Sequence, residues 1–232
     1  MGGGGGSSPY AQWLVYLTAY AILLGRAYFY CGWFESCSFM PVMRSSSVAA
    51  VLVTNATSPQ QVVRGIDVIV DARESRRLVF SYTVVADLHR LLIPMAEAPR
   101  RVDELWKHTC FEAFFGMKGS ATYYEFNFSP SRQWSAFGFG GYRVPGPMDL
   151  DWEAPRISVE ETTDRLTLTA AVRFDRLPLI RAGAALRIGL SAVMEAADGA
   201  LSYWALKHPS DKPDFHHPDS FVLEVTLPDG SA

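Results

Sequence analysis

Residues Leu105 to Phe139 read LWKHTCFEAFFGMKGSATYYEFNFSPSRQWSAFGF, three consecutive runs in which aromatic and polar side chains alternate. Because a β-strand points successive side chains to opposite faces of its sheet, this period of two predicts strands with unlike faces. In the second run one face is aromatic and the other is polar. The aromatic face holds Tyr124, Phe126 and Phe128, and the polar face holds Tyr123, Glu125, Asn127 and Ser129.

The first run divides in the same way. Its apolar set is Phe111, Ala113 and Phe115, and its opposite set is Trp106, His108, Cys110, Glu112 and Phe114. If the two runs pair as neighbours, the second face gathers two carboxylates, an imidazole, an amide and hydroxyl groups beside large rings. This mixture of polar and aromatic groups suits a polar small molecule such as a sugar.

Strand-like alternation continues from Leu52 onward, and no helical stripe competes with it. Further runs occupy residues 62–70, 77–85, 133–140, 165–174, 185–194, 201–207 and 220–227, separated by clusters of Gly, Pro, Asp and Ser. Together with the two central runs these make about nine strands. Many short strands without intervening helices predict an all-β fold, an antiparallel β-sandwich. We expect one such ligand-binding domain over residues 51–232.

The composition describes a folded protein without an extended basic surface. The chain has 232 residues, of which 49% are apolar, and this is enough for a sizeable core. Its formal charge is −3, with 21 basic and 24 acidic residues interspersed, so nucleic acid is not expected as a partner. The cysteines Cys31, Cys37 and Cys110 cannot form a framework of paired disulfides, and we interpret Cys110 as a half-buried structural thiol.

Residues 1–50 differ in composition from the rest of the chain. A Gly-rich lead precedes a hydrophobic N-terminal extension over residues 11–34, in which Arg26 is the one charged residue. The length of this extension falls between a short buried helix and a transmembrane span of about 20 residues. Three interpretations stay open: a membrane anchor, an accessory helix, or an artefact of start-site choice. The protein would be membrane-anchored if residues 11–34 are inserted, and cytoplasmic if translation starts near Met43.

Glu112 and Glu125 are the candidates for chemistry on the polar face. If they were directly paired on adjacent strands, their carboxyl groups could approach the ~5 Å separation of a retaining glycosidase. The alternative is that each accepts hydrogen bonds from Lys207, Arg132, Arg143 or a ligand hydroxyl, as glutamates on half-buried faces usually do. We favour this alternative and predict no catalytic residue.

The segment KHPSDKPDFHHPDSF, residues 207–221, holds three of the five histidines and three prolines. Functional side chains concentrate in loops of this kind. His208, Asp214, His216 and His217 offer imidazole and carboxylate groups, but their spacing matches no recognised metal-binding motif. We therefore predict no metal site, and we expect these residues to close the rim of a binding site or to order the loop.

Three runs together resemble the bacterial DOMON-like proteins, which are relatives of the family 9 carbohydrate-binding modules. The runs are LWKHTCFEAFF, YYEFNFSPSRQW and LSYWALKHPSDKPDFHHPDSF, and the resemblance covers about Leu52 to Leu227. It implies a β-sandwich that binds a sugar or, in other branches, a haem. It does not imply catalysis.

The resemblance also names candidate ligand contacts. In the sugar-binding modules two aromatic side chains clamp the ligand, and Trp106, Trp134 and Trp204 are the candidates here. The haem-binding branches use a methionine with a histidine or a lysine. Met194 or Met117 with a histidine is available for such a pair, although no spacing specifies it.

We therefore predict a non-catalytic domain that binds a carbohydrate or similar polyol on one sheet face, without a cofactor. A haem-binding electron-transfer domain and a glycoside hydrolase using Glu112 and Glu125 stay open as alternatives. The expected partner is a small-molecule ligand; residues 11–34 could contact a membrane, and the domain could serve a neighbouring enzyme. The predicted ligand-binding residues are Trp106, His108, Glu112, Tyr123, Glu125, Asn127, Trp134, Trp204, Lys207, His208, Asp214, His216 and His217.

Overall fold

The computed structural model describes residues 46–58, 62–74, 76–146 and 153–229, all within one compact unit that extends from Met43 to Ala232. This part of the chain contains twelve β-strands and four short 3-10 helices, but no α-helix. None of its helices is long and apolar enough to cross a membrane. The predicted all-β fold is confirmed, whereas residues 11–34, Cys31 and Cys37 lie outside the described residues.

The strands are short, and the longest of them, β10, has 11 residues. In chain order they are β1 (Ser47–Thr54), β2 (Val63–Asp71), β3 (Arg77–Ala86), β4 (Cys110–Met117), β5 (Tyr123–Phe128), β6 (Trp134–Gly141), β7 (Val144–Pro145), β8 (Arg156–Glu161), β9 (Arg165–Arg173), β10 (Ala185–Glu195), β11 (Leu201–Ala205) and β12 (Leu223–Thr226). The 3-10 helices are η1 (Leu88–Arg90), η2 (Leu105–Lys107), η3 (Phe174–Arg176) and η4 (Pro218–Ser220).

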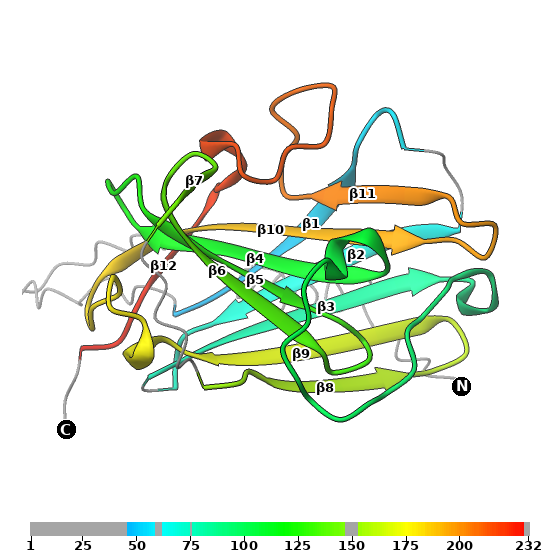
Figure 1. Ribbon diagram of the computed structural model, residues 1–232, viewed down its shortest axis with the longest axis horizontal. Coiled ribbons are helices and arrows are strands. Elements are labelled where there is room, and N and C mark those ends of the chain that lie inside the picture. Colours follow the sequence, from blue (N-terminus) through cyan, green and yellow to red (C-terminus); the bar gives the residue numbers. More distant parts are fainter. Residues whose placement is uncertain (1–45, 59–61, 75, 147–152, 230–232) are drawn as a thin grey trace, which may run out of the picture. The chain divides into compact units, whose positions relative to one another are not determined.

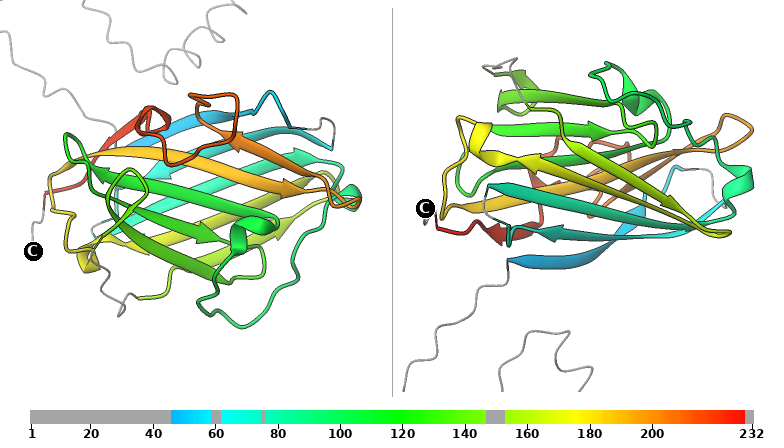
Figure 2. Two further views of the ribbon diagram at one scale, coloured as in Figure 1. Left: turned by 45° about the horizontal axis from the view of Figure 1, so that its top comes forward. Right: turned by 90° about the horizontal axis from the view of Figure 1, so that it is seen from below.

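The strands form two antiparallel layers that pack face to face (Figures 1 and 2). One layer has the order β1-β2-β3-β9-β8, and the other has the order β7-β6-β5-β4-β10-β11. The layers are joined where β1 also pairs with β11, through Val53 opposite Ala205 and Thr54 opposite Trp204. Because β4 occupies one edge of β10, the strands β12 and β11 share the other edge, one after the other along its length.

The apolar faces predicted from the alternation meet in the core between the layers. Phe80 and Tyr82 of β3 contact Phe115 and Phe111 of β4, with ring centroids 5.7 and 5.1 Å apart. The Tyr82 hydroxyl donates a hydrogen bond of 2.8 Å to the backbone carbonyl of Glu112. This bond satisfies a phenol that is fully buried, and it ties one layer to the other beneath the polar face of β4.

The strand ends differ from the predicted runs at two places that matter for the site. The first central run was expected to be extended from Trp106, but η2 precedes it and β4 begins at Cys110. The backbone of Glu104 has a left-handed φ of 64°, which turns the chain into η2. At the other end, η4 replaces the beginning of the last predicted run, since Pro218 favours the first position of a helix.

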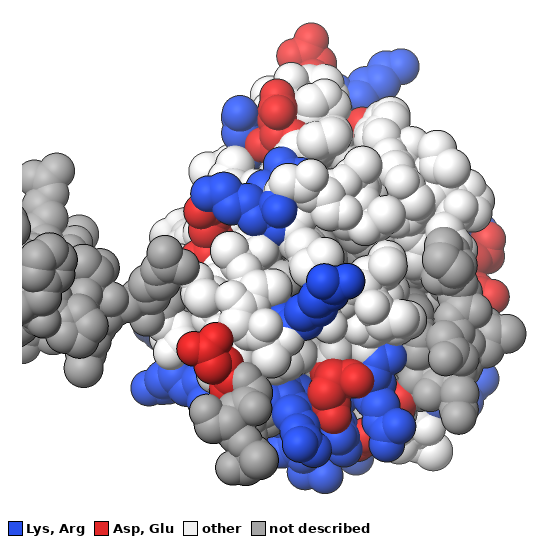
Figure 3. Space-filling model, turned by 90° about the vertical axis from the view of Figure 1, so that its left-hand side faces the viewer, with Lys and Arg blue, Asp and Glu red and all other residues white. Residues whose placement is uncertain are grey.

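The surface carries both signs of charge. On the side drawn in Figure 3, basic side chains are interspersed with acidic ones, in keeping with the small net charge of the sequence. Several charged side chains of the described residues pair locally, such as Lys118 with Glu224 at 2.8 Å and Arg64 with Asp164 at 3.2 Å.

Candidate functional site

A row of buried polar side chains crosses the outer face of the layer that holds β4, β5, β6 and β10. The register pairs Ser191 with Glu112, Glu112 with Asn127, and Asn127 with Ser135. All four residues are at most 3% exposed. Glu125 lies two residues along β5 from Asn127, so Glu112 and Glu125 are diagonal neighbours. The direct pairing of these two glutamates that was considered from the sequence is therefore wrong.

Hydrogen bonds within this row come from neutral groups and not from the basic residues that the sequence suggested. The Ser191 hydroxyl donates to Glu112 Oε2 at 3.1 Å. The Asn127 amide donates to Glu125 Oε1 at 2.8 Å and to Ser135 Oγ at 3.2 Å. Asn127 Oδ1 is buried and has no hydrogen-bond partner among the described residues. The row thus holds more hydrogen-bond acceptors than donors.

Burial shifts the protonation of both carboxyl groups. It raises the pKa of Glu112 to about 8, and the nearby charge of Glu125 adds to the rise. Burial also raises the pKa of Glu125 to about 7, although the Asn127 hydrogen bond and the charge of Arg143 act in the opposite direction. Because the two buried carboxyl groups lie close together and repel each other's charge, near neutral pH the pair as a whole keeps a proton.

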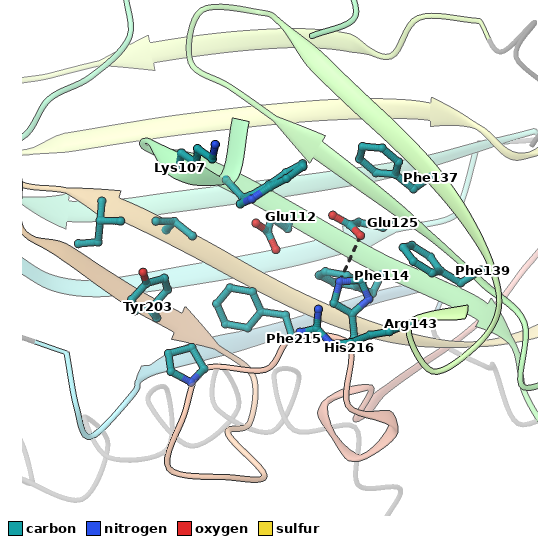
Figure 4. A pocket seen from close by; sticks show the side chains of 14 residues that line it. Lys107, Glu112, Phe114, Glu125, Phe137, Phe139, Arg143, Tyr203, Phe215 and His216 are labelled. Atoms are coloured by element: carbon teal, nitrogen blue, oxygen red, sulfur yellow. Dashed lines mark ion pairs between the residues drawn. The ribbon is translucent and has the colours of Figure 1, made fainter. Parts of the chain in front are cut away.

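The carboxyl groups of Glu112 and Glu125 point into a cavity of about 570 Å³ (Figure 4). This volume lies within the usual range for small-molecule sites. Six aromatic rings line the wall, namely Trp106, Phe114, Phe137, Phe139, Tyr203 and Phe215. The polar groups on the wall are Lys107, Glu112, Glu125, Arg143 and His216. A mostly apolar cavity with a few convergent polar groups is typical of a ligand site.

His216 joins the 207–221 loop to the carboxyl pair. Its Nδ1 is 2.9 Å from the Tyr123 hydroxyl, and its Nε2 is 3.5 Å from Glu125 Oε2. Burial, helped by the charge of Arg143, lowers the pKa of His216 to about 4. The imidazole is therefore neutral at physiological pH, and it brings no positive charge to the glutamates.

Aromatic packing holds the 207–221 loop against the sheet. The Phe221 ring lies over Gly189 of β10, where an added Cβ would come within 2.7 Å of the ring. The same ring packs against Phe114 at 5.9 Å and against Tyr123 at 5.3 Å between centroids. The absence of a side chain at position 189 thus permits the Phe221 ring to lie close against β10.

The tight hairpin between β6 and β7 supplies the other side of the cavity. Arg143 has a left-handed φ of 54°, which is uncommon for a residue with a side chain. Asp214 of the loop holds this hairpin in place, because its carboxylate accepts a hydrogen bond of 2.9 Å from Arg143 and one of 2.6 Å from the Tyr142 hydroxyl. These contacts keep the pKa of Asp214 below its usual value in spite of partial burial. Asp214 therefore orders the rim and does not line the cavity.

Two of the residues predicted for the outer face, Trp106 and Tyr123, take different positions around the cavity. Trp106 of η2 lines the cavity, is 38% exposed, and meets Phe137 edge to face with centroids 6.0 Å apart. Tyr123 stacks on Phe139 at 4.8 Å and supports His216 from below. The Tyr123 ring thus acts as a support for the wall.

The structure places Trp134 and Trp204 on the opposite side of the layer. Both rings belong to the core between the two layers, where they are 6% and 7% exposed. The Trp204 indole donates to Ser202, and the Trp134 indole nitrogen is buried without a partner among the described residues. Alternation explains this position. Trp134 precedes Ser135 and Trp204 follows Tyr203, and both of these neighbours point to the outer face. The expected stacking of the two tryptophans on a ligand does not agree with this position.

Four other predicted residues lie away from the cavity. His108 contacts Glu195 at 2.8 Å, and Lys207 is exposed. His208 Nε2 is 3.0 Å from the backbone carbonyl of Val53, so this histidine fixes the loop to β1. His217 caps η4 by accepting a hydrogen bond from the backbone N–H of Asp219. The histidines at 208 and 217 therefore order the loop, as one of the two expectations had it.

The groups considered for other chemistry are dispersed. Met194 is packed in the core, and Met117 lies at the core edge, so neither lines the cavity. Cys110 is a free thiol and fully buried, which raises its pKa well above the usual value. Within the described ranges no cluster of three or more His, Cys, Asp or Glu residues is arranged to hold a metal ion.

Several cavity residues were missed in the sequence. Phe137 and Phe139 alternate with Ala136 and Gly138 in β6, and the register of Asn127 with Ser135 brings them beside Glu125. The period of two in QWSAFGFG was a signal for this face. Tyr203 precedes Trp204 in β11 and takes the outward position. Phe215, in contrast, comes from a loop whose path no alternation predicts.

Comparison with known proteins gives a fold and no close relative. No protein-family model and no curated protein matches the chain. Among solved structures the chain is similar to one described as a "putative carbohydrate-binding protein" from Bacteroides uniformis, with a TM-score of 0.54 and 15% identity over 78% of this chain and 86% of the other. This likeness establishes a shared fold.

Two further structures are family 9 carbohydrate-binding modules from Caldicellulosiruptor kristjanssonii, one in complex with glucose and one with cellotriose. The glucose complex has a TM-score of 0.49 and the cellotriose complex one of 0.46, each at 8% identity over 78% of this chain. The matches cover 86% and 84% of those chains, respectively.

Proposed function

We propose that this protein is a non-catalytic domain that binds a carbohydrate or a similar polyol in the cavity above β4 and β5. The observation that carries the proposal is the pair of buried carboxyl groups, Glu112 and Glu125, at the base of an aromatic-walled cavity of about 570 Å³. The resemblance of the sequence to DOMON-like proteins and family 9 modules supports it. So does the shared fold with a protein whose description names carbohydrate binding.

The chemistry of the cavity suits a sugar ring. A pyranose has hydroxyl groups around its edge and patches of C–H on its faces. The carboxyl oxygens at the base would accept hydrogen bonds from hydroxyl groups, and bonds to the ionised member of the pair would be charge-assisted, about twice as strong as neutral ones. Trp106 and Phe215 would pack on the C–H faces, since large rings bury apolar area while they keep a defined geometry.

The test is a calorimetric screen of monosaccharides and short oligosaccharides against the full chain and the variant Glu112→Gln. Gln has the shape of the protonated carboxyl, so the fold should persist while affinity falls by about 10-fold or more. Glu160→Gln, on the exposed edge strand β8, is the matched control and should bind like the parent. Loss of stability with unchanged affinity in Glu112→Gln would show that the residue is structural and would refute its binding role.

A glycoside hydrolase is a second candidate, favoured by the raised pKa of Glu112, because a general acid must hold its proton near neutral pH. In that case an activated aryl glycoside would be turned over, and the turnover would disappear in both Glu112→Gln and Glu125→Gln. Binding without turnover in the parent protein would reject this candidate and leave the binding function in place.

A further inference from the structure

Building on the proposed sugar-binding function, we infer that the preferred ligand carries a protonated amine, as in an amino sugar, and that its ammonium group binds between Glu112 and Glu125. The three observations behind this inference are independent of one another. They are the charge balance of the cavity, its shortage of hydrogen-bond donors, and the aromatic character of its wall.

The basic groups of the cavity are already engaged elsewhere. Lys107 pairs with Glu104 at 2.7 Å, and Arg143 pairs with Asp214 at 2.9 Å. The charge of Arg143 reaches Glu125, but its hydrogen bonds go to the loop. Among the described residues, neither buried glutamate has a Lys or Arg within ion-pair distance. Buried carboxylates are normally paired with a cation, so this pair lacks a counter-ion that a ligand could bring.

The carboxyl pair also lacks hydrogen-bond donors. Among the described residues Ser191 donates to Glu112 and the Asn127 amide donates to Glu125, and the neutral His216 imidazole approaches Glu125 Oε2 through Nε2 only at 3.5 Å. Asn127 Oδ1, beside them, is a buried acceptor without a partner in the described part of the chain. A shared proton on the pair supplies one donor. An ammonium group supplies three N–H donors and no acceptor, which is the deficit that this cluster presents.

The rings around the carboxyl groups add a second attraction for a cation, and Phe137 already holds one cation, the Arg101 guanidinium, 5.9 Å from its centroid. In Figure 4 Phe137 and Phe139 flank the glutamates on one side, and Tyr203 and Phe215 lie on the other. The face of an aromatic ring attracts a cation within about 6 Å of its centroid. Carboxylates at the base with rings around them would hold an ammonium ion by both effects. A metal ion is a poorer fit, because the described residues provide no third ligand.

The other titratable and charged groups near the pair do not replace this counter-ion. From β3 the Tyr82 hydroxyl is buried behind Glu112, and from β4 the Cys110 thiol is buried on the same face. From the loop His216 is neutral, because burial holds its pKa at about 4. The remaining groups near the pair are Tyr123 and Ser191, with Lys107 and Arg143 at the cavity wall in ion pairs with Glu104 and with Asp214 of the rim.

The experiment compares ligands that differ at one substituent, by calorimetry with the full chain at pH 6.5. The series consists of three 2-amino hexoses (glucosamine, galactosamine and mannosamine), their N-acetyl derivatives, the parent hexoses, and ethanolamine as an amine without a sugar ring. At this pH an alkyl amine is protonated. We expect at least one amino hexose to bind about 10- to 100-fold more tightly than its neutral counterparts, as charged hydrogen bonds imply.

Proton release gives a second readout. The bound ammonium should lower the pKa values of the carboxyl pair and displace its proton, so the heat of binding should depend on the ionisation enthalpy of the buffer. A neutral hexose should show no such dependence. In the double variant Glu112→Gln/Glu125→Gln the preference for the amino sugar should fall to about 1-fold, whereas Glu160→Gln should keep it.

The outcomes separate this inference from the function on which it rests. Preferential binding of an amino hexose with proton release supports both. Equal binding of amino, acetylated and parent hexoses overturns the inference and leaves the sugar-binding function standing. Binding of ethanolamine as tight as that of the amino hexoses, without binding of any neutral sugar, supports ammonium recognition and refutes sugar binding. Binding of none of these compounds overturns both.

Discussion

The two faces of the hairpin formed by β4 and β5 are almost equally buried, but different parts of the molecule cover them. The inner face, with Phe115 and Phe126, meets the rings of β3 across the core. The outer face, with Glu112 and Glu125, is covered by a loop and a tight turn that leave a cavity between them. Every residue of β5 is buried. Burial alone therefore does not distinguish the core from a site, whereas the polarity of a buried face and the space above it do.

The tryptophans illustrate the same difference. Trp134 and Trp204 are on the inner face and fill the core, whereas Trp106 is on the outer side and remains partly exposed. Mutations on the inner face should therefore lower stability and spare ligand affinity. Mutations on the outer face should lower ligand affinity and leave most of the stability in place.

The largest expected effect is on the inner face. Phe126 is 1% exposed and stacks on Phe115 and Phe128, with centroids 5.7 and 6.1 Å apart. Phe126→Ala should lower the free energy of unfolding by about 3–5 kcal/mol, the usual cost of removing a buried ring. Denaturant unfolding measures this change, and calorimetry well below the melting temperature should give the parental ligand affinity. A loss of less than about 1 kcal/mol, or a parallel loss of affinity, would contradict the division between the faces.

The next effect concerns the pH dependence of stability. An acid whose pKa is higher in the folded state than in the unfolded state binds more protons when folded, so stability falls as pH rises between the two values. For Glu112 and Glu125 this range runs from the ordinary glutamate pKa to about 8. His216 has a lowered pKa and acts in the opposite direction between about 4 and 6.5. His216 should therefore offset about half of the fall below pH 6.5, and above that value the two glutamates act almost unopposed.

Between pH 6.5 and 8 the parent protein should lose about 2 kcal/mol of unfolding free energy, at 1.36 kcal/mol for each proton and pH unit. Glu112→Gln/Glu125→Gln should remove most of this slope, because neither side chain can then ionise. Glu160→Gln should keep it, since that residue is exposed on β8. Urea titrations at several pH values would reveal the difference. A slope that persists in the double variant would refute the assignment of the raised pKa values to this pair.

Much of the fold could be predicted from the sequence because one face of nearly every strand is apolar. In β9, for example, Leu166, Leu168, Ala170 and Val172 alternate with residues that are polar except at position 171, and all four are buried as expected. A period of two fixes which side chains face the core, whatever the strand pairs with. The aromatic and polar faces of β5 followed for the same reason.

The complete site could not be predicted, because most of it comes from pairing and loops. The diagonal relation of Glu112 to Glu125 depends on register, which alternation does not reveal. Trp204 was expected to stack on a ligand, but its ring is in the core, and its neighbour Tyr203 has the outward position that reaches the cavity. Arg143 reaches the rim through a left-handed turn residue, and such a conformation has no signal in a sequence without glycine or asparagine at that position.

The smallest expected effect is at the rim, where the charge of Arg143 acts on His216. Arg143 is about half exposed, so its ion pair with Asp214 should contribute about 0 to 1 kcal/mol to stability. Its positive charge nevertheless helps to lower the pKa of His216, while the charge of Asp214 acts in the opposite direction. Arg143→Gln removes the positive charge that lowers this pKa and leaves the negative charge of Asp214, which raises it. The pKa of His216 should therefore rise from about 4 toward its ordinary value.

An NMR titration of the His216 imidazole would measure this shift, with Arg156→Gln on the exposed β8 as the control that should leave it unchanged. A rise without loss of stability would show that the rim sets the charge of the site and contributes little to the fold, in contrast to the inner face. An unchanged pKa would mean that burial alone keeps His216 neutral. The hairpin would then shape the cavity without tuning its electrostatics, and the preference for a cationic ligand would depend on the carboxyl pair alone.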